Sequence, residues 1–452
     1  MRAHLSSRPM PSRPGGVAPL TILSLVLLAG IVALVVDGGS LMEERRHAQA
    51  TADAAALAAT ADLYTNYATN GGTDPKGAAT ASAQAIAAAN GFSNDGVQSV
   101  VTVNVSPQNY QSGPNAGTAI PPGYVEVIVQ YNAGRTFSGI FGSGAIPVRA
   151  RAVARGQWSS DTNMVILLNL SSSSVLSIAT GCGLKVNGGL LVNTSSSAGI
   201  NLGLTSTLSA AEFNVNQAVQ GLLGFVLSLL KGLLGGPPTV HYLPPIADPL
   251  RYLPDPDPVQ LGLSLRGTNL HVSGGVADLY PGLYNGGISI SGGAAVTFHA
   301  NADGTPGIYF LQGGGLTVSG PSSAKVSASE TAGVMIYNDW QGSGDTINVS
   351  GSSSLTLSPP ASGVYKGITL FQKRGTLSSP APTLSITGSG AMNLAGTIYA
   401  AHAKVSMTGP SSANVMGGQI IADTLSLTGS ATINIDASTK PIANTRRLGL
   451  VQ

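Results

Sequence analysis

The sequence predicts a membrane-anchored protein of three parts. These are an N-terminal transmembrane helix with an Ala-rich stalk, a small α/β membrane-proximal module, and a C-terminal all-β parallel β-helix, or solenoid. Three observations predict it: an uncharged apolar run, an Ala-rich segment directly after it, and three short strand patterns that recur in fixed order. Charged residues are only 9% of the 452 residues, against roughly 25% in ordinary soluble proteins. A polar but uncharged surface is therefore expected.

The apolar run is Val17–Val36, which contains no charge. A helix of this length rises roughly 30 Å, enough to cross the hydrocarbon core of a bilayer. The preceding residues 1–16 hold no acid but four basic side chains, Arg2, His4, Arg8 and Arg13. The positive-inside rule then predicts a cytoplasmic N-terminus and an extracytoplasmic remainder.

A cleaved signal peptide is the competing interpretation of the same run. The run is longer than a usual signal core, and the sequence Val-Val-Asp-Gly-Gly-Ser that ends it lacks a small-x-small cleavage site. We therefore expect an uncleaved signal anchor.

The stalk, residues 37–69, is expected to be helical because Leu41–Leu63 consists of strong helix formers. Its alanines leave a thin surface, which lets another helix approach closely. Candidate interface residues for a partner helix are Leu41, Ala48, Ala52, Ala55 and Ala59. A monomeric stalk would carry the same alanines, so the sequence leaves both possibilities open.

The junction between the run and the stalk carries a motif, VDGG-x-L followed by ERR-x-x-Q-x-x-ADAAALAA. Its residues are Val36, Asp37, Gly38, Gly39, Leu41, Glu44, Arg45, Arg46, Gln49, Ala52, Asp53, Ala54, Ala55, Ala56, Leu57, Ala58 and Ala59. Over about residues 15–62 the chain resembles the N-terminal region of TadG-like Flp pilus-assembly proteins. The resemblance implies an inner-membrane, pseudopilin-like component of bacterial tight-adherence pilus or secretion systems, with assembly or secretion proteins as partners.

Two readings qualify this resemblance. A prepilin-peptidase site needs Glu at the fifth position after the processed glycine, and after Gly16 that position is Thr21, so no prepilin-type cleavage is expected. The alternative to the family interpretation is an Ala-rich stalk that happens to follow an anchor.

Residues 70–157 predict the α/β module. Lys76–Ala89 is a second Ala-rich helix, ended by Asn90-Gly91. Three segments with strand patterns follow it, Val97–Val105, Tyr124–Tyr131 and Ile146–Ala154.

The second half of the sequence predicts a solenoid, because three short sequence motifs, which we call words, recur in one order. Examples are Gly307-Ile308-Tyr309-Phe310, Val318-Ser319-Gly320 and Lys325-Val326-Ser327. A repeat of three strands in roughly 20 residues is typical of one coil of a parallel β-helix. An antiparallel β-sandwich is the alternative, which fits the fixed word order poorly. We expect first coils in 158–236, further coils in 261–438 and a tail in 439–452.

Two segments interrupt the words. Ala218–Leu234 is apolar but too short and too broken by glycine to span a membrane, so it either caps the solenoid or contacts a bilayer or partner. Residues 237–260 predict an extended, proline-stiffened linker. Within it Asp255 and Asp257 serve turns or, alternatively, offer oxygens to Ca²⁺.

No catalytic, cofactor or metal site is predicted. The acids of the solenoid are Asp278, Asp303, Glu330, Asp339, Asp345, Asp423 and Asp436, and we expect no two to stack on adjacent coils because they fall in different words. His402 and Lys404 are expected to be a surface pair. Asn169 replaces the first Asp of a von Willebrand A-type metal site, so that site is rejected. Cys182 is the single cysteine, which excludes an intrachain disulfide and favours a small buried side chain.

Two functions remain open from the sequence. The first is a non-enzymatic membrane protein of pilus assembly or secretion, whose solenoid is a scaffold or an adhesive surface. The second is a membrane-tethered glycan-binding or glycan-cleaving β-helix, which requires a pair of carboxylates on one face. The net charge of +2 argues against nucleic acid as a partner. A glycan or other surface ligand and the oligomeric state are left undecided.

Overall fold

The computed structural model describes residues 17–140, 142–196, 198–216, 239–376, 379, 381–387, 392–409, 414–429, 432–436 and 442–451. The chain divides into two compact units. Unit 1 runs to Trp158 and takes in the chain again from Arg447, whereas unit 2 comprises residues 159–446. In the sequence, unit 2 is therefore an insertion between two strands of unit 1.

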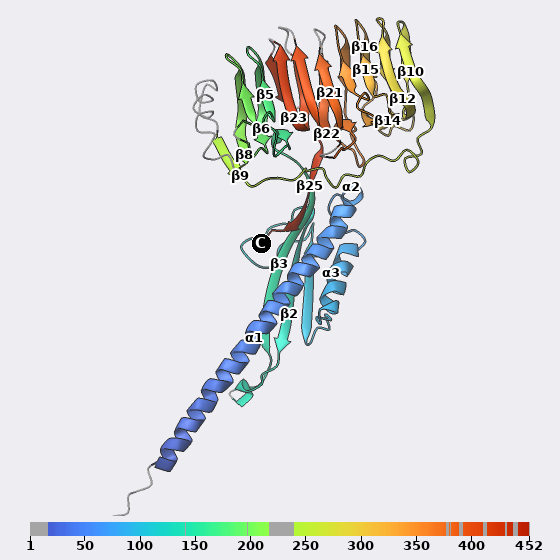
Figure 1. Cartoon of the computed structure of the whole chain (residues 1–452). Helices are drawn as coiled ribbons and strands as arrows, with labels where there is room; N and C mark the ends of the chain where they lie inside the picture. The colour runs from blue at the N-terminus through green and yellow to red at the C-terminus, as the bar shows by residue number, and fades with distance from the viewer. Residues whose placement is uncertain are drawn as a thin grey trace, which may run out of the picture. The chain divides into compact units, whose positions relative to one another are not determined.

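Unit 1 consists of a long helix, shorter helices and a four-stranded sheet (Figure 1). Its elements are α1 (Val17–Thr65), α2 (Tyr67–Asn70), α3 (Ala78–Ala89), β1 (Ser99–Val105), β2 (Tyr124–Ala133), η1 (Ser138–Ile140), β3 (Ile146–Ser160) and β25 (Asn444–Leu450). The strand order is β1-β2-β3-β25. The helix and three strands expected in 70–157 thus form α3 and β1–β3, and the Asp74 carboxylate caps α3 by accepting the N–H groups of Ala79 and Thr80.

The expected transmembrane segment and most of the stalk form one continuous helix, α1, which ends at Thr65; the last residues of the expected stalk, 66–69, lie at the break before α2 and in α2. Gly38 and Gly39 lie inside it, although a glycine costs a helix interior about 1 kcal/mol relative to alanine. The strong helix formers on both sides maintain the helix through this point.

The core of unit 1 lies between the two helices and one face of the sheet. Its buried members are Ala48, Ala52, Ala55, Ala56, Ala59 and Leu63 of α1; Ala79, Ala83 and Ala87 of α3; Phe92, which follows α3; Val101 and Val105 of β1; Val125, Val127 and Val129 of β2; and Ala150, Ala152 and Ala154 of β3. The approach of β3 to α1 is close enough to require glycine, because a Cβ on Gly156 would lie 2.1 Å from the Thr60 carbonyl oxygen. Small side chains therefore set the spacing of this unit.

Unit 2 is built from short parallel strands in two blocks of the chain. The first block contains β4 (Asn163–Leu167), β5 (Leu176–Ile178), β6 (Gly183–Val192), β7 (Ile200–Leu202), β8 (Thr207–Asn216) and β9 (Thr239–Leu243). The second contains β10 (Leu265–Ser273), β11 (Val276–Leu279), β12 (Gly282–Ser291), β13 (Ala295–Phe298), β14 (Gly307–Gln312), β15 (Leu316–Val318), β16 (Ser323–Val326), β17 (Val334–Asp339), β18 (Ile347–Val349), β19 (Ser354–Leu357), β20 (Ile368–Gln372), β21 (Ala381–Thr387), β22 (Met392–Gly409), β23 (Asn414–Gly429) and β24 (Thr432–Asp436).

The pairing confirms a parallel β-helix. Each strand of the middle coils pairs in parallel with the strand three positions later, as in β14–β17–β20, β15–β18–β21 and β16–β19–β22. The three recurring words are therefore the three strands of one coil.

The coils do not stack in chain order. β23, near the end of the second block, pairs in parallel with β4 and β5, the first strands of the solenoid. The first block continues from there to β9, whereas β10 begins the second block at the other end of the stack (Figure 1). One inward column crosses this junction without interruption, through Ile336, Leu370, Ile398, Ile420, Val165 and Leu190, all at most 1% exposed.

This order requires a long connection along the stack. About ten strand spacings of ~4.8 Å separate β9 from β10, roughly 48 Å, which the 244–264 segment covers easily because extended chain reaches ~3.3 Å per residue. We call residues 244–264 the strap. The Pro-rich linker expected in 237–260 is thus partly β9 and mostly strap.

The strap covers an aromatic ladder on the outside of the solenoid. Phe310, Tyr337, Phe371 and Tyr399 lie in register on successive coils, with ring centroids 4.8–5.1 Å apart. Leu250 and Leu253 of the strap are buried with them in one cluster. This second core explains why the strands that carry the ladder, β14, β17, β20 and β22, are apolar on both of their faces.

The expected tail in 439–452 was wrong. Asn444–Leu450 form β25, an edge strand of the unit 1 sheet, and the Val451 N–H donates to the Val153 carbonyl (2.8 Å). The strand was missed because its sequence, Asn-Thr-Arg-Arg-Leu-Gly-Leu, has little strand pattern and is ordered by the β3 edge. The expectations for residues 1–16 and Ala218–Leu234 lie outside the described residues.

Candidate membrane anchor and interaction surfaces

The N-terminal half of α1 is an exposed apolar cylinder. Its most apolar window has a mean hydropathy of 2.7 and is only 6% buried within the protein, and among the described residues it is the one helix long and apolar enough to cross a membrane. Leu20, Leu23 and Leu34 are 72–76% exposed, and Val36 is 44% exposed. Val17 begins the helix. An exposed apolar surface of this length makes this part of α1 a candidate membrane anchor.

The alanine face of the stalk is covered by the chain itself. Ala48, Ala52, Ala55 and Ala59 have no exposed surface and belong to the core with α3 and the sheet, while Leu41 is half-buried. The four alanines are thus buried within the chain and are not accessible to a partner helix, whereas Leu41 is partly accessible. Small residues do permit close packing, but here the neighbour lies later in the same chain.

The opposite side of α1 stays open in unit 1. Met42 is 69% and Leu57 37% exposed, and Ala50 and Ala54 between them are exposed as well. We call these four residues the outward stripe. Sequence patterning could not find it, because alanines lie on both sides of the helix.

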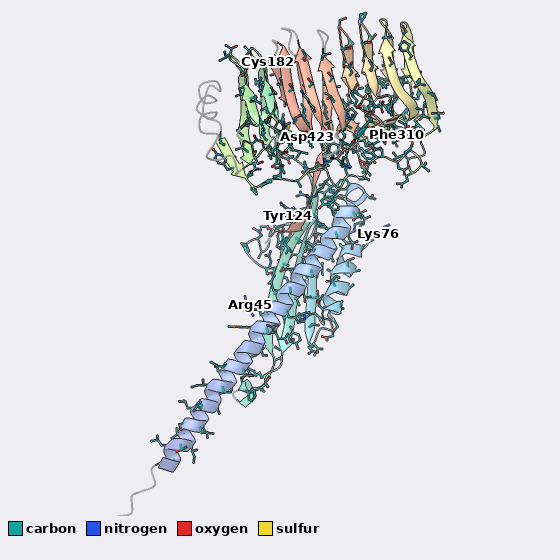
Figure 2. All side chains as sticks on the ribbon, viewed as in Figure 1. Arg45, Lys76, Tyr124, Cys182, Phe310 and Asp423 are labelled. Carbon is teal, nitrogen blue, oxygen red and sulfur yellow. The ribbon has the colours of Figure 1, made fainter. Side chains whose placement is uncertain are left out.

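A polar hollow of about 470 Å³ lies between α1 and the sheet strands β1, β2 and β3. Its lining includes Arg45 and Gln49 of the motif together with Arg149, Arg151 and Gln111. The Gln49 amide donates to the Arg151 carbonyl oxygen (2.9 Å), which ties the motif to the sheet. Figure 2 shows Arg45 on the side of α1 away from Lys76 and α3.

A buried carboxylate holds the floor of this hollow in place. Glu126 is fully buried and accepts hydrogen bonds from the Gln111 N–H (2.7 Å), the Arg151 Nε (2.6 Å) and the Asn104 amide (2.9 Å). Burial by itself raises the pKa of Glu126, but these donors outweigh it and hold the pKa below its ordinary value. The carboxylate is a structural anion rather than an acid group poised for proton transfer.

The solenoid brings together one cluster of titratable groups. His299 follows β13 and contacts Asp278 through Nε2 (3.0 Å) and Glu330 through Nδ1 (2.8 Å), while Tyr280 stacks on its ring at 5.0 Å. The Asp278 carboxylate, with Glu330 on the other nitrogen, raises the pKa of His299 although burial acts to lower it.

The expectation that no two solenoid acids stack on adjacent coils concerned direct stacking, whereas here a histidine on the intervening coil joins two acids. Asp278 lies in β11, which pairs with β13, and β13 pairs with β16, after which Glu330 follows. Asp278 and Glu330 therefore lie on the coils on either side of the one that carries His299, an arrangement that the sequence analysis did not predict.

The other acids of the solenoid are engaged singly. Asp423 accepts from the Asn169 amide (2.9 Å), and Asp339 pairs with Lys373 (2.6 Å). Asp345 accepts the N–H groups of Gln341 and Gly342 in its own loop and of Gly314 on the preceding coil. Asp255 of the strap pairs with Arg374 (2.6 Å), and Asp257 accepts the N–H groups of Val259 and Gln260 in a turn. Asp303 accepts the Thr305 N–H, and Asp436 accepts from the Asn187 amide (3.2 Å).

Three further residues lie as follows. Cys182 is 2% exposed and donates to the Gly429 carbonyl oxygen, and burial raises the pKa of its thiol. His402 and Lys404 are exposed on β22. Within the described ranges, no three His, Cys, Asp or Glu side chains are arranged to hold a metal ion.

Comparison with known proteins identifies the N-terminal region. Residues 15–63 match the family model of Flp pilus-assembly TadE/G-like proteins, which covers the apolar run, the VDGG motif and the Ala-rich helix. No curated protein and no solved structure matches the chain. The similarity to TadE/G-like Flp pilus-assembly proteins thus concerns residues 15–63, of which Val17 onward form the greater part of α1.

Proposed function

We propose that the protein is a non-enzymatic, single-pass inner-membrane component of Flp pilus assembly or tight-adherence secretion. An uncleaved signal anchor holds it, with the N-terminus in the cytoplasm and both folded units outside. The solenoid serves as a scaffold or adhesive surface. The observation that carries the proposal is the family match to residues 15–63. From Val17 onward these residues lie on one helix, which is exposed and apolar at its start and packed into a folded core toward its end.

The continuity of α1 supports a role in assembly. Because the helix is packed by Ala48, Ala52 and Ala55 against α3 and the sheet, the orientation of the span is coupled rigidly to unit 1. A partner that binds α1 must use what the chain leaves uncovered, which is the outward stripe rather than the alanine face.

Co-purification from detergent-solubilised membranes tests the proposal. The full-length protein is the bait, and mass spectrometry reads out recovered pilus-assembly or secretion components. Ala50→Arg and Ala54→Arg in the outward stripe should reduce recovery, because a long charged side chain blocks a close helix contact. Ala85→Arg, at an exposed position of α3, is the matched control and should not.

Two results would contradict the proposal. Recovery of the bait alone removes the assembly role, and equal recovery with all three variants moves the interface away from α1. Orientation is tested separately by protease protection of spheroplasts, in which both units should be digested from outside.

The proposal that the solenoid is non-enzymatic is supported by the His299 cluster. Both ring nitrogens of His299 face carboxylates, so Asp278 and Glu330 each contact the histidine ring rather than flanking an open space for a sugar bond. Glycan cleavage that disappears in Asp278→Asn and Glu330→Gln would favour the glycan-active alternative instead.

A further inference from the structure

The loop between β2 and β3 reaches the end of the membrane span. We call the described residues 134–140 and 142–145 the β2–β3 tip; Phe137 is its large apolar side chain with a described environment, and its sequence holds no acid. The Asp37 carboxylate accepts the N–H of Phe137 (3.0 Å) and the N–H of Ser138 (2.6 Å). Since Asp37 directly follows Val36, this clamp fixes the tip at the last turn of the apolar run.

Burial along α1 shows that the contact extends into the run. Ala33, one turn before Asp37, is 5% exposed, whereas Val32 and Leu34 beside it are 51% and 76% exposed. The η1 segment of the tip contacts α1. One helical turn rises ~5.4 Å, so the chain covers α1 to about that depth inside the predicted hydrocarbon boundary.

The clamp also removes the cost of a carboxylate at this depth. Asp37 is only 7% exposed, and a charge at the edge of hydrocarbon is expensive unless its oxygens are paired. Backbone N–H groups of the tip supply that pairing. In return the tip is held with Phe137 46% exposed, at the level where lipid begins.

We propose that the β2–β3 tip inserts into the interfacial region of the bilayer, as a second lipid contact beside the helical anchor. Its partner is the lipid surface itself, because the tip is continuous with the span and presents an apolar side chain and Arg135 rather than acids. A second contact would fix the tilt and rotation of α1, which a single helix leaves free. The inference rests on the proposed anchoring by α1.

Tryptophan quenching in vesicles tests the insertion. The full-length protein is reconstituted in phosphatidylcholine–phosphatidylglycerol vesicles that contain phosphatidylcholine brominated on its acyl chains. Phe137→Trp is compared with the unsubstituted protein, in which Trp158 and Trp340 give the baseline. The added emission should be blue-shifted and lose most of its intensity with brominated lipid.

Two matched variants make the result decisive. Val97→Trp is exposed in the same unit but precedes β1 in a loop near Phe92, whose ring packs on His47 (5.1 Å), about ten residues or ~15 Å beyond Asp37 along α1. It should not be quenched. Leu27→Trp, in the middle of the span, should be quenched strongly.

The outcomes separate this inference from the anchoring. Quenching at position 27 without quenching at 137 overturns tip insertion and leaves the anchor intact. No quenching at either position overturns the anchoring as well. In the Phe137→Trp background, Asp37→Ala should reduce quenching at the tip while circular dichroism stays unchanged; undiminished quenching would show that Asp37 is not the clamp.

Discussion

The two units bury their interiors with different side chains. In unit 1, alanines of α1 and α3 lie against valines and alanines of the sheet, so the elements approach until backbone nearly meets backbone, as at Gly156 and Thr60. In unit 2, stacked Ile, Leu and Val fill the inside of the coils, and aromatic rings under the strap make a second layer outside. In unit 1, where the elements are close-packed, substitution by a larger side chain should be the more destabilising change. In unit 2, where large side chains fill the coils, substitution by a smaller side chain should leave a destabilising cavity.

The largest expected effect is a cavity in the solenoid column. Ile398→Ala should destabilise unit 2 by about 4 kcal/mol, because Ile398 is fully buried between Leu370 and Ile420 of the neighbouring coils. Hydrogen exchange read by peptide measures it, since a protein of two units has no single unfolding free energy. Lys404→Ala, exposed on the same strand, should change exchange little. Equal loss of protection in unit 1 would contradict independent cores.

The next effect concerns the strap. Arg374 donates to Tyr399, to Asp255 and to the carbonyl oxygens of Leu250 and Leu253. Arg374→Ala should cost on the order of 3 kcal/mol, because it leaves buried acceptors and Asp248 without their cation. Protease sensitivity confined to the strap is the measurement.

The control for the strap is Lys366→Ala, an exposed cation nearby in the sequence. If Arg374→Ala leaves the strap as resistant as Lys366→Ala does, the apolar ladder alone holds it.

A smaller effect is expected from adding atoms to unit 1. Ala52→Leu should destabilise it by about 2 kcal/mol, because no space exists between α1 and its neighbours for a larger side chain. Ala54→Leu, on the outward stripe, should be nearly neutral. Hydrogen exchange of α3, measured as the temperature is raised, distinguishes the two variants. Equal protection of α3 in Ala52→Leu and Ala54→Leu would mean that α1 is not packed as described.

The smallest effect is electrostatic and belongs to unit 2. The pKa of His299 is raised in the folded state by Asp278 and Glu330, so its stabilisation is fully present below the pKa of the unfolded histidine, about 6.5, and is lost as pH rises through the folded pKa. The change should be under about 1 kcal/mol, as partly exposed ion pairs usually contribute. The stability of unit 2 toward denaturant, measured from below pH ~6.5 to above the folded pKa of His299, gives the size of this change.

The His299→Gln variant should lose that pH dependence, whereas His402→Gln, exposed on β22, should keep it. A pH dependence that persists in His299→Gln would assign it to other groups.

Local patterns determined much of the fold. The apolar length of Val17–Val36, the helix formers of Leu41–Leu63 and the ordered words of the second half predicted the long helix, the strands β1–β3 and the parallel solenoid. These features depend on residues close in the sequence, where propensity and periodicity act.

Tertiary structure decided what covers each surface. The alanines of the stalk permit close packing with any neighbour, and only the fold shows that the neighbour is α3 and the sheet. The Asp278–His299–Glu330 cluster and the Asp37 clamp join residues that the sequence keeps apart.

By itself, then, the sequence determined the apolar span, the resemblance of residues 15–63 to a known family and most elements of both units, because each depends on a local pattern. Only the folded chain decided that β4 stacks beside β23, that the strap covers the aromatic ladder, and that β25 returns to β3. The physical reason is that parallel coils pair equally well with any neighbour in register, so the stacking order depends on where the connections can reach.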